Sequence, residues 1–396
     1  MARALRIGDM PPTRKPKAVA KAKANPKTKL LQYALSAGYC QFEGCPKRVL
    51  GDDATERVFN TGQVAHNVGA SADGPRGDAE RSAELVDDVE NVMLLCYEHH
   101  RLVDEEDPAS YPEERLRAMK RAQEERVALI GGIAPDKKSH VLVYGSSVGS
   151  HPAVLGRETT DPALLSRGRY PAAKESFQIQ TKGDLKSECS PHFWESERAN
   201  LLEHYQTIVR PSLSRQSDPH VSVFAFAAQP LLVLLGSLLS DKFRVDVFQR
   251  HRVPDSGWTW PDLDGKYAPL APTYERPTDT TKRPALVISL SATITDDRVK
   301  RALGDDCSIW HVRIPEPNHH CIKSPADLVV WRAFVQRLLN EIKAAHGHGT
   351  PLHIFPAMPN SAAVELGLVR QEKAEMPFHL YDALPGQDFT HAFNIE

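Results

Sequence analysis

Two pairs of potential metal ligands constrain the N-terminal region more than any other feature of the sequence. Cys40 and Cys45 stand in "CQFEGC", and Cys96 and His99 stand in "CYEH". Thiolate and imidazole are preferred ligands of zinc, and two such pairs fill the tetrahedral shell of a structural zinc ion. The alternative is two buried thiols beside ordinary surface histidines. We predict a structural zinc site, because both pairs have ligand-like spacing and the segment between them suits a small metal-stapled fold.

The residues after the second pair carry further polar groups. Adjacent residues at the start of a helix diverge by about 100°, so His100 is expected to face away from the zinc ion. Asp104 stands four residues later and therefore lies on the same helix face as His100. An imidazole and a carboxylate on one face make half of an open divalent-cation site, which water and phosphate oxygens complete. This pattern predicts a catalytic Mg²⁺ site of the kind that a one-metal nuclease needs.

A histidine between the two pairs is the candidate for a general base. His66 stands in "QVAHNV", at the end of a strand-like run. An imidazole titrates near ~6.5, so it can take a proton from an attacking water near neutral pH. The alternative is an ordinary structural histidine in a strand. Asn91 precedes the strand-like "VMLLC", where its amide can tie the loop that carries His66 to the following helix.

The order of these residues resembles the HNH endonuclease motif of the ββα-metal fold. His66, Asn91 and His100 follow one another with the family's spacing, and Asp104 stands just beyond. The flanking Cys/His pairs resemble those of the zinc-containing branch. The resemblance implies hydrolysis of double-stranded DNA, with His66 as general base, Asn91 as orienting residue, and His100 binding Mg²⁺ with Asp104.

One position departs from that motif. Many members of the family carry Asp immediately before the first His as a metal ligand, and this chain has Ala65 there. Asp104 is therefore the first candidate for the second Mg²⁺ ligand, and His66 and Asn91 are the alternatives.

The start of the chain is strongly basic. Residues 1–30 hold nine Lys and Arg residues against the single Asp9, although the whole chain has a net charge of −2. We expect a disordered tail, either simply solvated or binding nucleic acid electrostatically. The tail lacks the apolar core of a secretory signal, and the longest apolar run, residues 230–239, is shorter than the ~20 residues that a bilayer requires. We therefore expect an intracellular, cytoplasmic protein without a membrane span.

The length of 396 residues predicts two or three domains. A long helix is expected at 112–130, where acidic residues lead and many charges pair. We place the HNH domain at 31–130, a linker at 131–139 and a second domain at 140–396. In the second domain, strand-like runs alternate with helices, which predicts parallel sheets in two α/β halves. The runs are "SVFAFA" (222–227), "RVDVFQR", "ALVISLS" (285–291), "IWHVRIP" (309–315), "LHIFPA" and "FHLYD".

The carboxyl ends of these strands are the expected ligand site of the second domain, because open α/β sheets bind ligands there. The ends carry amides, hydroxyls, Arg and His, and a helix that opens at Asn360 would attract phosphate. Trp258 and Trp260 either stack on a base or simply pack. Together these groups suit a cyclic nucleotide. The predicted contacts are Gln229, Pro230, Arg250, Arg252, Trp258, Trp260, Pro359, Asn360 and Ser361.

Two segments of this domain, "VSVFAFAAQPLLVLLGSLLSDKFRVDVFQRHR" and "HIFPAMPNSAAVELG", resemble the SAVED domain, a fusion of two CARF-like Rossmann halves. With the HNH motif, the chain resembles the HNH-SAVED effectors of CBASS antiphage systems. That resemblance implies a bacterial nuclease that a cyclic dinucleotide or related cyclic oligonucleotide, made by a partner nucleotidyltransferase, switches on to degrade double-stranded DNA.

We expect the ligand to activate cleavage by shifting a homo-oligomer equilibrium that brings HNH modules together on DNA. Two other functions compete with this one. The chain could be a modification-dependent restriction endonuclease whose second domain reads a modified base. It could also be a DNA-binding regulator with a catalytically inactive HNH fold, which Ala65 favours.

Overall fold

A computed structural model describes residues 23–52, 57–145, 155–181, 191–252, 257–263, 265, 267–371, 374–383 and 386–396. The chain divides into two compact units, Met1–Gly132 and Ile133–Glu396, and each is described by itself. Among the helices in the described ranges, none combines the length and the apolar character that crossing a membrane requires.

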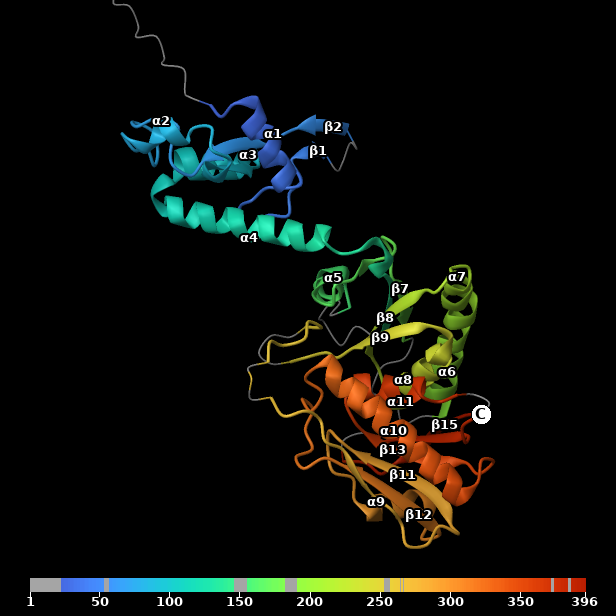
Figure 1. Cartoon of the computed structure of the whole chain (residues 1–396). Coiled ribbons are helices and arrows are strands. Elements are labelled where there is room, and N and C mark those ends of the chain that lie inside the picture. Colours follow the sequence, from blue (N-terminus) through green and yellow to red (C-terminus); the bar gives the residue numbers. More distant parts are fainter. Residues whose placement is uncertain are drawn as a thin grey trace, which may run out of the picture. The chain divides into compact units, whose positions relative to one another are not determined.

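The first unit contains short strands and helices and one long helix (Figure 1). Strands β3 and β4 pair antiparallel, with His66 opposite Val92. Helix α3 follows β4 directly, with Cys96 as its N-cap residue. This order is an antiparallel strand pair, joined by a long connection that contains α2, followed by a helix. The elements are α1 (Pro26–Leu35), β1 (Leu50–Asp52), β2 (Arg57–Asn60), β3 (Gln63–His66), α2 (Arg81–Leu85), β4 (Val92–Leu95), α3 (Tyr97–Arg101) and α4 (Glu113–Gly131).

The predicted boundary of the basic tail is corrected at its end. Residues 1–22 lie outside the described ranges, but α1 begins at Pro26, inside the segment 1–30 that we assigned to the tail. The Asn25 side chain accepts a hydrogen bond from the amide of Thr28 at 2.9 Å. An Asn cap followed by Pro favours a helix start, and this local signal outweighs the basic composition.

Strand β4 forms the centre of the first unit's core. All four of its side chains are fully buried. Gln41 ties this strand to the segment with the first two cysteines, because its side-chain oxygen accepts the amide of Leu94 at 2.7 Å. The side chains that pack with β4 are Cys40, Val49, Ala65, Cys96, Val103, Leu116 and Met119.

The second unit contains two mainly parallel sheets, so the prediction of two α/β halves rather than one long sheet is confirmed. The five-stranded sheet has the order β6-β5-β8-β9, with β7 also paired to β5, and all its pairs are parallel. Its strands are β5 (Lys138–Gly145), β6 (Tyr170–Pro171), β7 (Phe177–Gln180), β8 (His220–Phe226) and β9 (Arg244–Phe248).

The six-stranded sheet has the order β10-β12-β11-β13-β14-β15. Its inner pairs are parallel, and the edge strands β10 and β15 run antiparallel to their neighbours. Its strands are β10 (Thr273–Glu275), β11 (Arg283–Ser289), β12 (Cys307–Arg313), β13 (Leu352–Ala357), β14 (Phe378–Asp382) and β15 (Thr390–Ile395).

Helices cover both sheets, and alternate strand residues pack on different helices, as strand geometry requires. On β11, Leu286 and Ile288 belong to the large core with α8, α10 and α11, whereas Ala285 and Val287 pack with α9. Helix α10 runs along the six-stranded sheet in Figure 1. The helices are α5 (Arg157–Ser166), α6 (Pro191–His204), α7 (Arg210–Ser214), α8 (Gln229–Leu239), α9 (Asp296–Leu303), α10 (Pro325–His346) and α11 (Asn360–Leu368).

Two glycines allow α8 and α11 to cross at close range. A β-carbon on Gly236 would lie 2.0 Å from the carbonyl oxygen of Val364, and one on Gly367 would lie 2.0 Å from that of Val233. Both contacts are with backbone, which cannot rotate away as a side chain can. The crossing joins the helix that follows β8 to the helix that follows β13, so it joins the two halves.

Gly236→Ala is expected to lower the free energy of unfolding of the second unit by about 3 kcal/mol, because the added methyl group forces the two backbones apart. Chemical denaturation measures this loss. Gly349→Ala is the matched control, since a β-carbon there meets nothing within 4 Å. Equal stabilities of the two variants would contradict the observed crossing.

The sequence-predicted strands and helices of the second unit are present, but the linker is shorter than predicted. β5 begins at Lys138, inside the proposed linker 131–139. Ser139 is fully buried, and its hydroxyl contacts His220 Nδ1 and the Ser222 hydroxyl, each at 2.8 Å. These contacts let a polar residue start a central strand, which composition alone does not indicate.

Candidate functional site

The four predicted zinc ligands converge in the first unit. One ligand atom of each of Cys40, Cys45, Cys96 and His99 lies within 4.8 Å of the others. His99 Nδ1 lies 3.6 Å from Cys40 Sγ and 3.2 Å from Cys96 Sγ. Ligands of a tetrahedral zinc ion are separated by ~3.6 Å when the bond lengths are ~2.3 Å to sulfur and ~2.0 Å to nitrogen. The donor set and its spacing therefore fit zinc.

The raised pKa values of two of these cysteines bear on zinc binding as well. Burial raises the pKa of the Cys40 thiol to about 12 and also raises the pKa of Cys96. Zinc binds thiolates, so a bound cation would supply the charge that holds these sulfurs deprotonated. The His99 ring stacks on Phe42 at 4.0 Å between centroids, which fixes the orientation of the imidazole.

His66 ends strand β3 and lines a pocket of about 440 Å³. Its Nε2 atom lies 3.1 Å from the carbonyl oxygen of Val86. A carbonyl only accepts hydrogen bonds, so this contact places the ring proton on Nε2 and leaves Nδ1 able to accept a proton. Burial lowers the pKa of His66, which favours the neutral form that a general base requires.

Asn91 is fully buried, and its side-chain amide forms hydrogen bonds with backbone groups. Its side-chain oxygen accepts the amide of Val68 at 2.8 Å, and its nitrogen donates to the carbonyls of Val68 and Leu85, each at 3.1 Å. These bonds tie the segment after His66 to the start of β4. Asn91 is not among the residues that line the pocket of His100 and Asp104, so its position favours an orienting role over metal binding.

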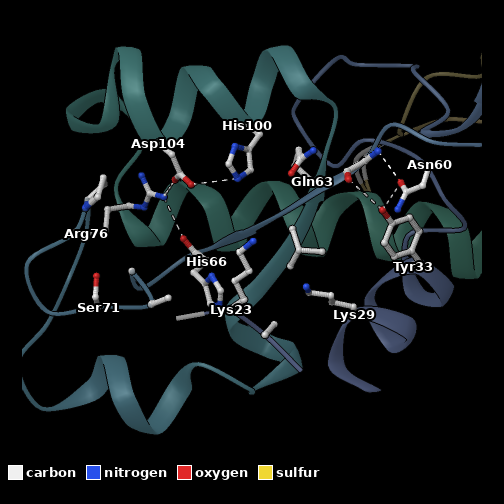
Figure 2. A pocket seen from close by; sticks show the side chains of 17 residues that line it. Lys23, Lys29, Tyr33, Asn60, Gln63, His66, Ser71, Arg76, His100 and Asp104 are labelled. Carbon is white, nitrogen blue, oxygen red and sulfur yellow. Dashed lines mark hydrogen bonds and ion pairs between the residues drawn. The ribbon is translucent and has the colours of Figure 1, made fainter. Parts of the chain in front are cut away.

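His100 and Asp104 lie together on the wall of the same pocket (Figure 2). His100 Nε2 is 3.4 Å from Asp104 Oδ2. Asp104 lies in a π-helical turn, Leu102–Glu106, that continues α3. One imidazole and one carboxylate facing a pocket fit an open divalent-cation site in which water and phosphate supply the other ligands. Ala65 is buried in the core and supplies none.

Arg76 is a part of this site that the sequence analysis missed. Its guanidinium contacts the second carboxylate oxygen of Asp104 and donates to the carbonyl oxygen of His66 at 3.1 Å (Figure 2). Its backbone has φ 56°, in the left-handed region that few non-glycine residues adopt. Arg76 therefore connects the candidate base to the candidate metal ligand. The polar loop that contains it was visible in the sequence, but its partners were not.

The second unit has a pocket of about 520 Å³ at the carboxyl ends of strands from both sheets. Every strand end that the sequence analysis proposed contributes to its wall. The lining residues are 226–229 at the end of β8, 249, 250 and 252 after β9, 291–294 after β11, 319–320 after β12 and 356–360 at the end of β13. The topological rule for ligand sites in open α/β sheets thus locates this pocket.

The predicted contact residues divide into two groups. Those that line the pocket are Gln229, Arg250, Arg252, Pro359 and Asn360, whereas Pro230, Trp258, Trp260 and Ser361 are not among the lining residues.

The prediction that Trp258 stacks on a base is wrong. Its side chain is completely buried and packs edge-on against Phe224 at 5.4 Å. Trp260 is half-buried and lies against His251 at 5.2 Å. Pro230 is buried in the first turn of α8, and the Ser361 hydroxyl donates to Gln249 Oε1 at 2.6 Å. The packing of these side chains, which a loop sequence does not reveal, removes them from the pocket.

The pocket presents polar donors that have no protein partner. Arg250 Nε and Ser291 Oγ are buried without a hydrogen bond in the described parts of the chain. A buried donor without a partner costs about 1–3 kcal/mol, which a polar ligand would recover. Arg250 also lies over the Phe226 ring at 5.0 Å. Other polar lining residues, which were not among the predicted contact residues, are Thr293, Arg298, His320 and Asp382.

The family comparison identifies most of the second unit. Residues 201–395 match the model of the SAVED family, the "SMODS-associated and fused to various effectors sensor domain". This part of the chain is thus similar to SAVED sensor domains, and its fold is mixed α/β as predicted. None of the curated proteins matches the chain.

Solved structures of Cap4 receptors are similar to the chain. The Acinetobacter baumannii Cap4 SAVED/CARF-domain containing receptor with the cyclic trinucleotide 2'3'3'-cAAA has 12% identity, a TM-score of 0.41 and coverage of 71% of this chain and 60% of its own. The same receptor with 3'3'3'-cAAA has 10% identity, a TM-score of 0.43 and the same coverage. The Moraxella osloensis Cap4 receptor has 9% identity, a TM-score of 0.38 and coverage of 72% and 59%. The chain thus spans about three fifths of the length of these receptors.

Proposed function

We propose that this protein is a DNA endonuclease that a cyclic oligonucleotide activates, and that it acts in CBASS-type antiphage defence. The observation that carries the proposal is the pairing of two sites in one chain. The first unit brings His66, His100 and Asp104 to one pocket beside a four-ligand cluster. Residues 201–395 of the second unit match the model of a sensor-domain family that is fused to various effectors.

In the first unit, the protein's own groups would prepare and deprotonate an attacking water. Neutral His66 would accept the proton at Nδ1, since Nε2 is held by the Val86 carbonyl. Asn91 would keep the His66 segment fixed to β4. Arg76 would hold Asp104 in place through its carboxylate contact.

His100 and Asp104 are the residues that would hold the divalent cation. Once bound, this cation would supply positive charge that stabilises the leaving oxygen of the phosphodiester. The pocket also contains Lys23 and Lys29, whose charges suit the DNA backbone.

In the second unit, the pocket at the strand ends would bind the activating nucleotide. Arg250, Arg252 and Arg298 would neutralise its phosphates. Because the ligand acts on the other unit, activation requires a state that ligand binding favours, and we propose that this state is an assembly of several chains. Measuring the mass of the protein with and without ligand tests this step, and an unchanged mass alongside activated cleavage would remove it.

Plasmid cleavage with Mg²⁺ tests the function directly, using a panel of cyclic di- and trinucleotides and a ligand-free control. We expect cleavage with one or a few members of the panel and none without ligand. Arg250→Ala should weaken binding of the active ligand by about 10- to 100-fold, since charge-assisted hydrogen bonds are lost. Arg337→Ala, on the exposed face of α10, is the matched control.

Other outcomes would favour the competing functions. Cleavage of modified DNA without any nucleotide would favour a restriction endonuclease. Absence of cleavage under every condition, with zinc bound and DNA binding retained, would favour a non-catalytic regulator.

A further inference from the structure

The two halves of the sensor unit share a local symmetry at the pocket. In each half a strand leads into a helix that opens on an amide residue, Gln229 in α8 and Asn360 in α11. In each helix a glycine stands seven residues after that amide, Gly236 and Gly367, and the two glycines meet at the helix crossing. Gln229 Oε1 accepts the amide of Met358 at 3.2 Å. The strand and helix β8–α8 in one half are therefore equivalent to β13–α11 in the other half.

Strand register extends this equivalence to the neighbouring strands. Val223 of β8 pairs with Val247 of β9, and the equivalent Ile354 of β13 pairs with Leu380 of β14. Two residues beyond Val247 stands Gln249, and two residues beyond Leu380 stands Asp382. Gln249 and Asp382 are thus equivalent positions, and both line the pocket.

The two equivalent side chains have different partners. Gln249 Oε1 accepts hydrogen bonds from the amide and the hydroxyl of Ser361, at 3.3 and 2.6 Å, in the first turn of α11. The equivalent of Ser361 in α8 is Pro230, which has no N–H to donate. Asp382 therefore lacks the helix contact that satisfies its counterpart.

The Asp382 carboxylate also forms no ion pair with any Lys, Arg or His of the described parts of the chain. In those parts the backbone amide of Ala383 is the donor that contacts it. Burial raises its pKa to about 6, so the group is mainly ionised at pH 7.5. An ionised carboxylate only accepts hydrogen bonds, and this half-buried one can gain from donors that a ligand brings into the pocket.

A lone carboxylate is unexpected in a pocket whose other charged lining residues are arginines and histidines. It would repel phosphates, so its favourable partners are donors on another part of the ligand. Among the bases, guanine alone presents two adjacent donors, N1–H and N2–H, that match two carboxylate oxygens. Adenine and cytosine place an acceptor nitrogen beside their amino group, which a carboxylate repels.

We propose that Asp382 makes this pocket select a nucleotide with guanine, by accepting hydrogen bonds from N1–H and N2–H of that base. The inference rests on the proposed binding of a cyclic oligonucleotide to the sensor unit. The inference assigns base specificity to Asp382, whereas the equivalent position in the other half, Gln249, is occupied by its contact with Ser361.

Calorimetric titration of the full chain at pH 7.5 tests this proposal, with cyclic di-GMP, cyclic di-AMP and the linkage isomers of cyclic GMP-AMP as probes. Guanine-containing ligands are expected to bind at least ~10-fold more tightly than cyclic di-AMP, since a good bidentate pair discriminates by that order. Asp382→Asn should weaken guanine ligands by about 10- to 100-fold and leave cyclic di-AMP unchanged or tighter. Asp305→Asn, an exposed carboxylate outside the pocket, is the matched control.

The outcomes separate this inference from the function on which it rests. Binding without guanine preference, or a preference that survives Asp382→Asn in a folded variant, overturns the inference alone. An equal loss of affinity for all ligands in Asp382→Asn would indicate that the carboxylate contacts the sugar and not the base, and this result would also overturn the inference. Failure of the folded wild-type chain to bind any cyclic oligonucleotide overturns the proposed sensing function, and this inference with it.

Discussion

Cys96→Ser is expected to remove zinc from the protein and to unfold the first unit. Cys96 is buried, begins α3 and lies directly after the central strand β4, so its ligation joins three parts of the unit. Structural zinc supplies about 10–16 kcal/mol of binding free energy at pH 7 in small zinc-dependent folds, which exceeds the stability of most domains. Elemental analysis should give one zinc per wild-type chain and a large loss in the variant.

The control for this experiment is Cys307→Ser. Cys307 lies on β12 of the second unit, outside the four-ligand cluster, and its loss should change neither zinc content nor the melting of the first unit. Treatment of the wild-type protein with a strong chelator should reproduce the effect of Cys96→Ser. A variant that keeps one zinc per chain and the same melting temperature would show that these four side chains hold no structural metal.

The part of the candidate site that could be predicted by spacing has local geometry, whereas His66 and Asn91 were assigned through the resemblance to the HNH motif. Cys96, His99, His100 and Asp104 lie within one helix and its continuation, so helical spacing already decides which side chains share a face. Arg76 was missed because its partners belong to other elements, including the His66 carbonyl. No spacing rule predicts contacts to a carbonyl across a fold.

In the second unit, too, some elements could be predicted from the sequence and others could not. Buried parallel strands such as β8 and β11 are continuous apolar runs, which the sequence displays directly. The antiparallel edge strands β10 and β15 are not continuous apolar runs. They are recognised as strands only through their pairing with β12 and β14, which the sequence does not display. Trp258 was misplaced because burial of an aromatic ring in a loop depends on its neighbours.

His66→Ala is expected to reduce ligand-activated DNA cleavage by about 10²- to 10⁴-fold, the usual contribution of a general base. Zinc content and nucleotide affinity should stay at wild-type values, because His66 is not in the four-ligand cluster and lies in the first unit. Cleavage rates under saturating ligand and Mg²⁺ provide the measurement. His348→Ala, at an exposed position of the second unit, serves as the matched control.

Chemical rescue separates the loss of a base from a loss of structure. Added imidazole can occupy the space that the His66 side chain leaves in the pocket of about 440 Å³ and can accept the proton from water. Partial recovery of cleavage by His66→Ala in imidazole buffer, without recovery for Asp104→Ala, would separate proton transfer from metal holding. Full activity of His66→Ala without imidazole would remove His66 from the mechanism. A cation held by His100 and Asp104 would then be the proposed group left to activate the water.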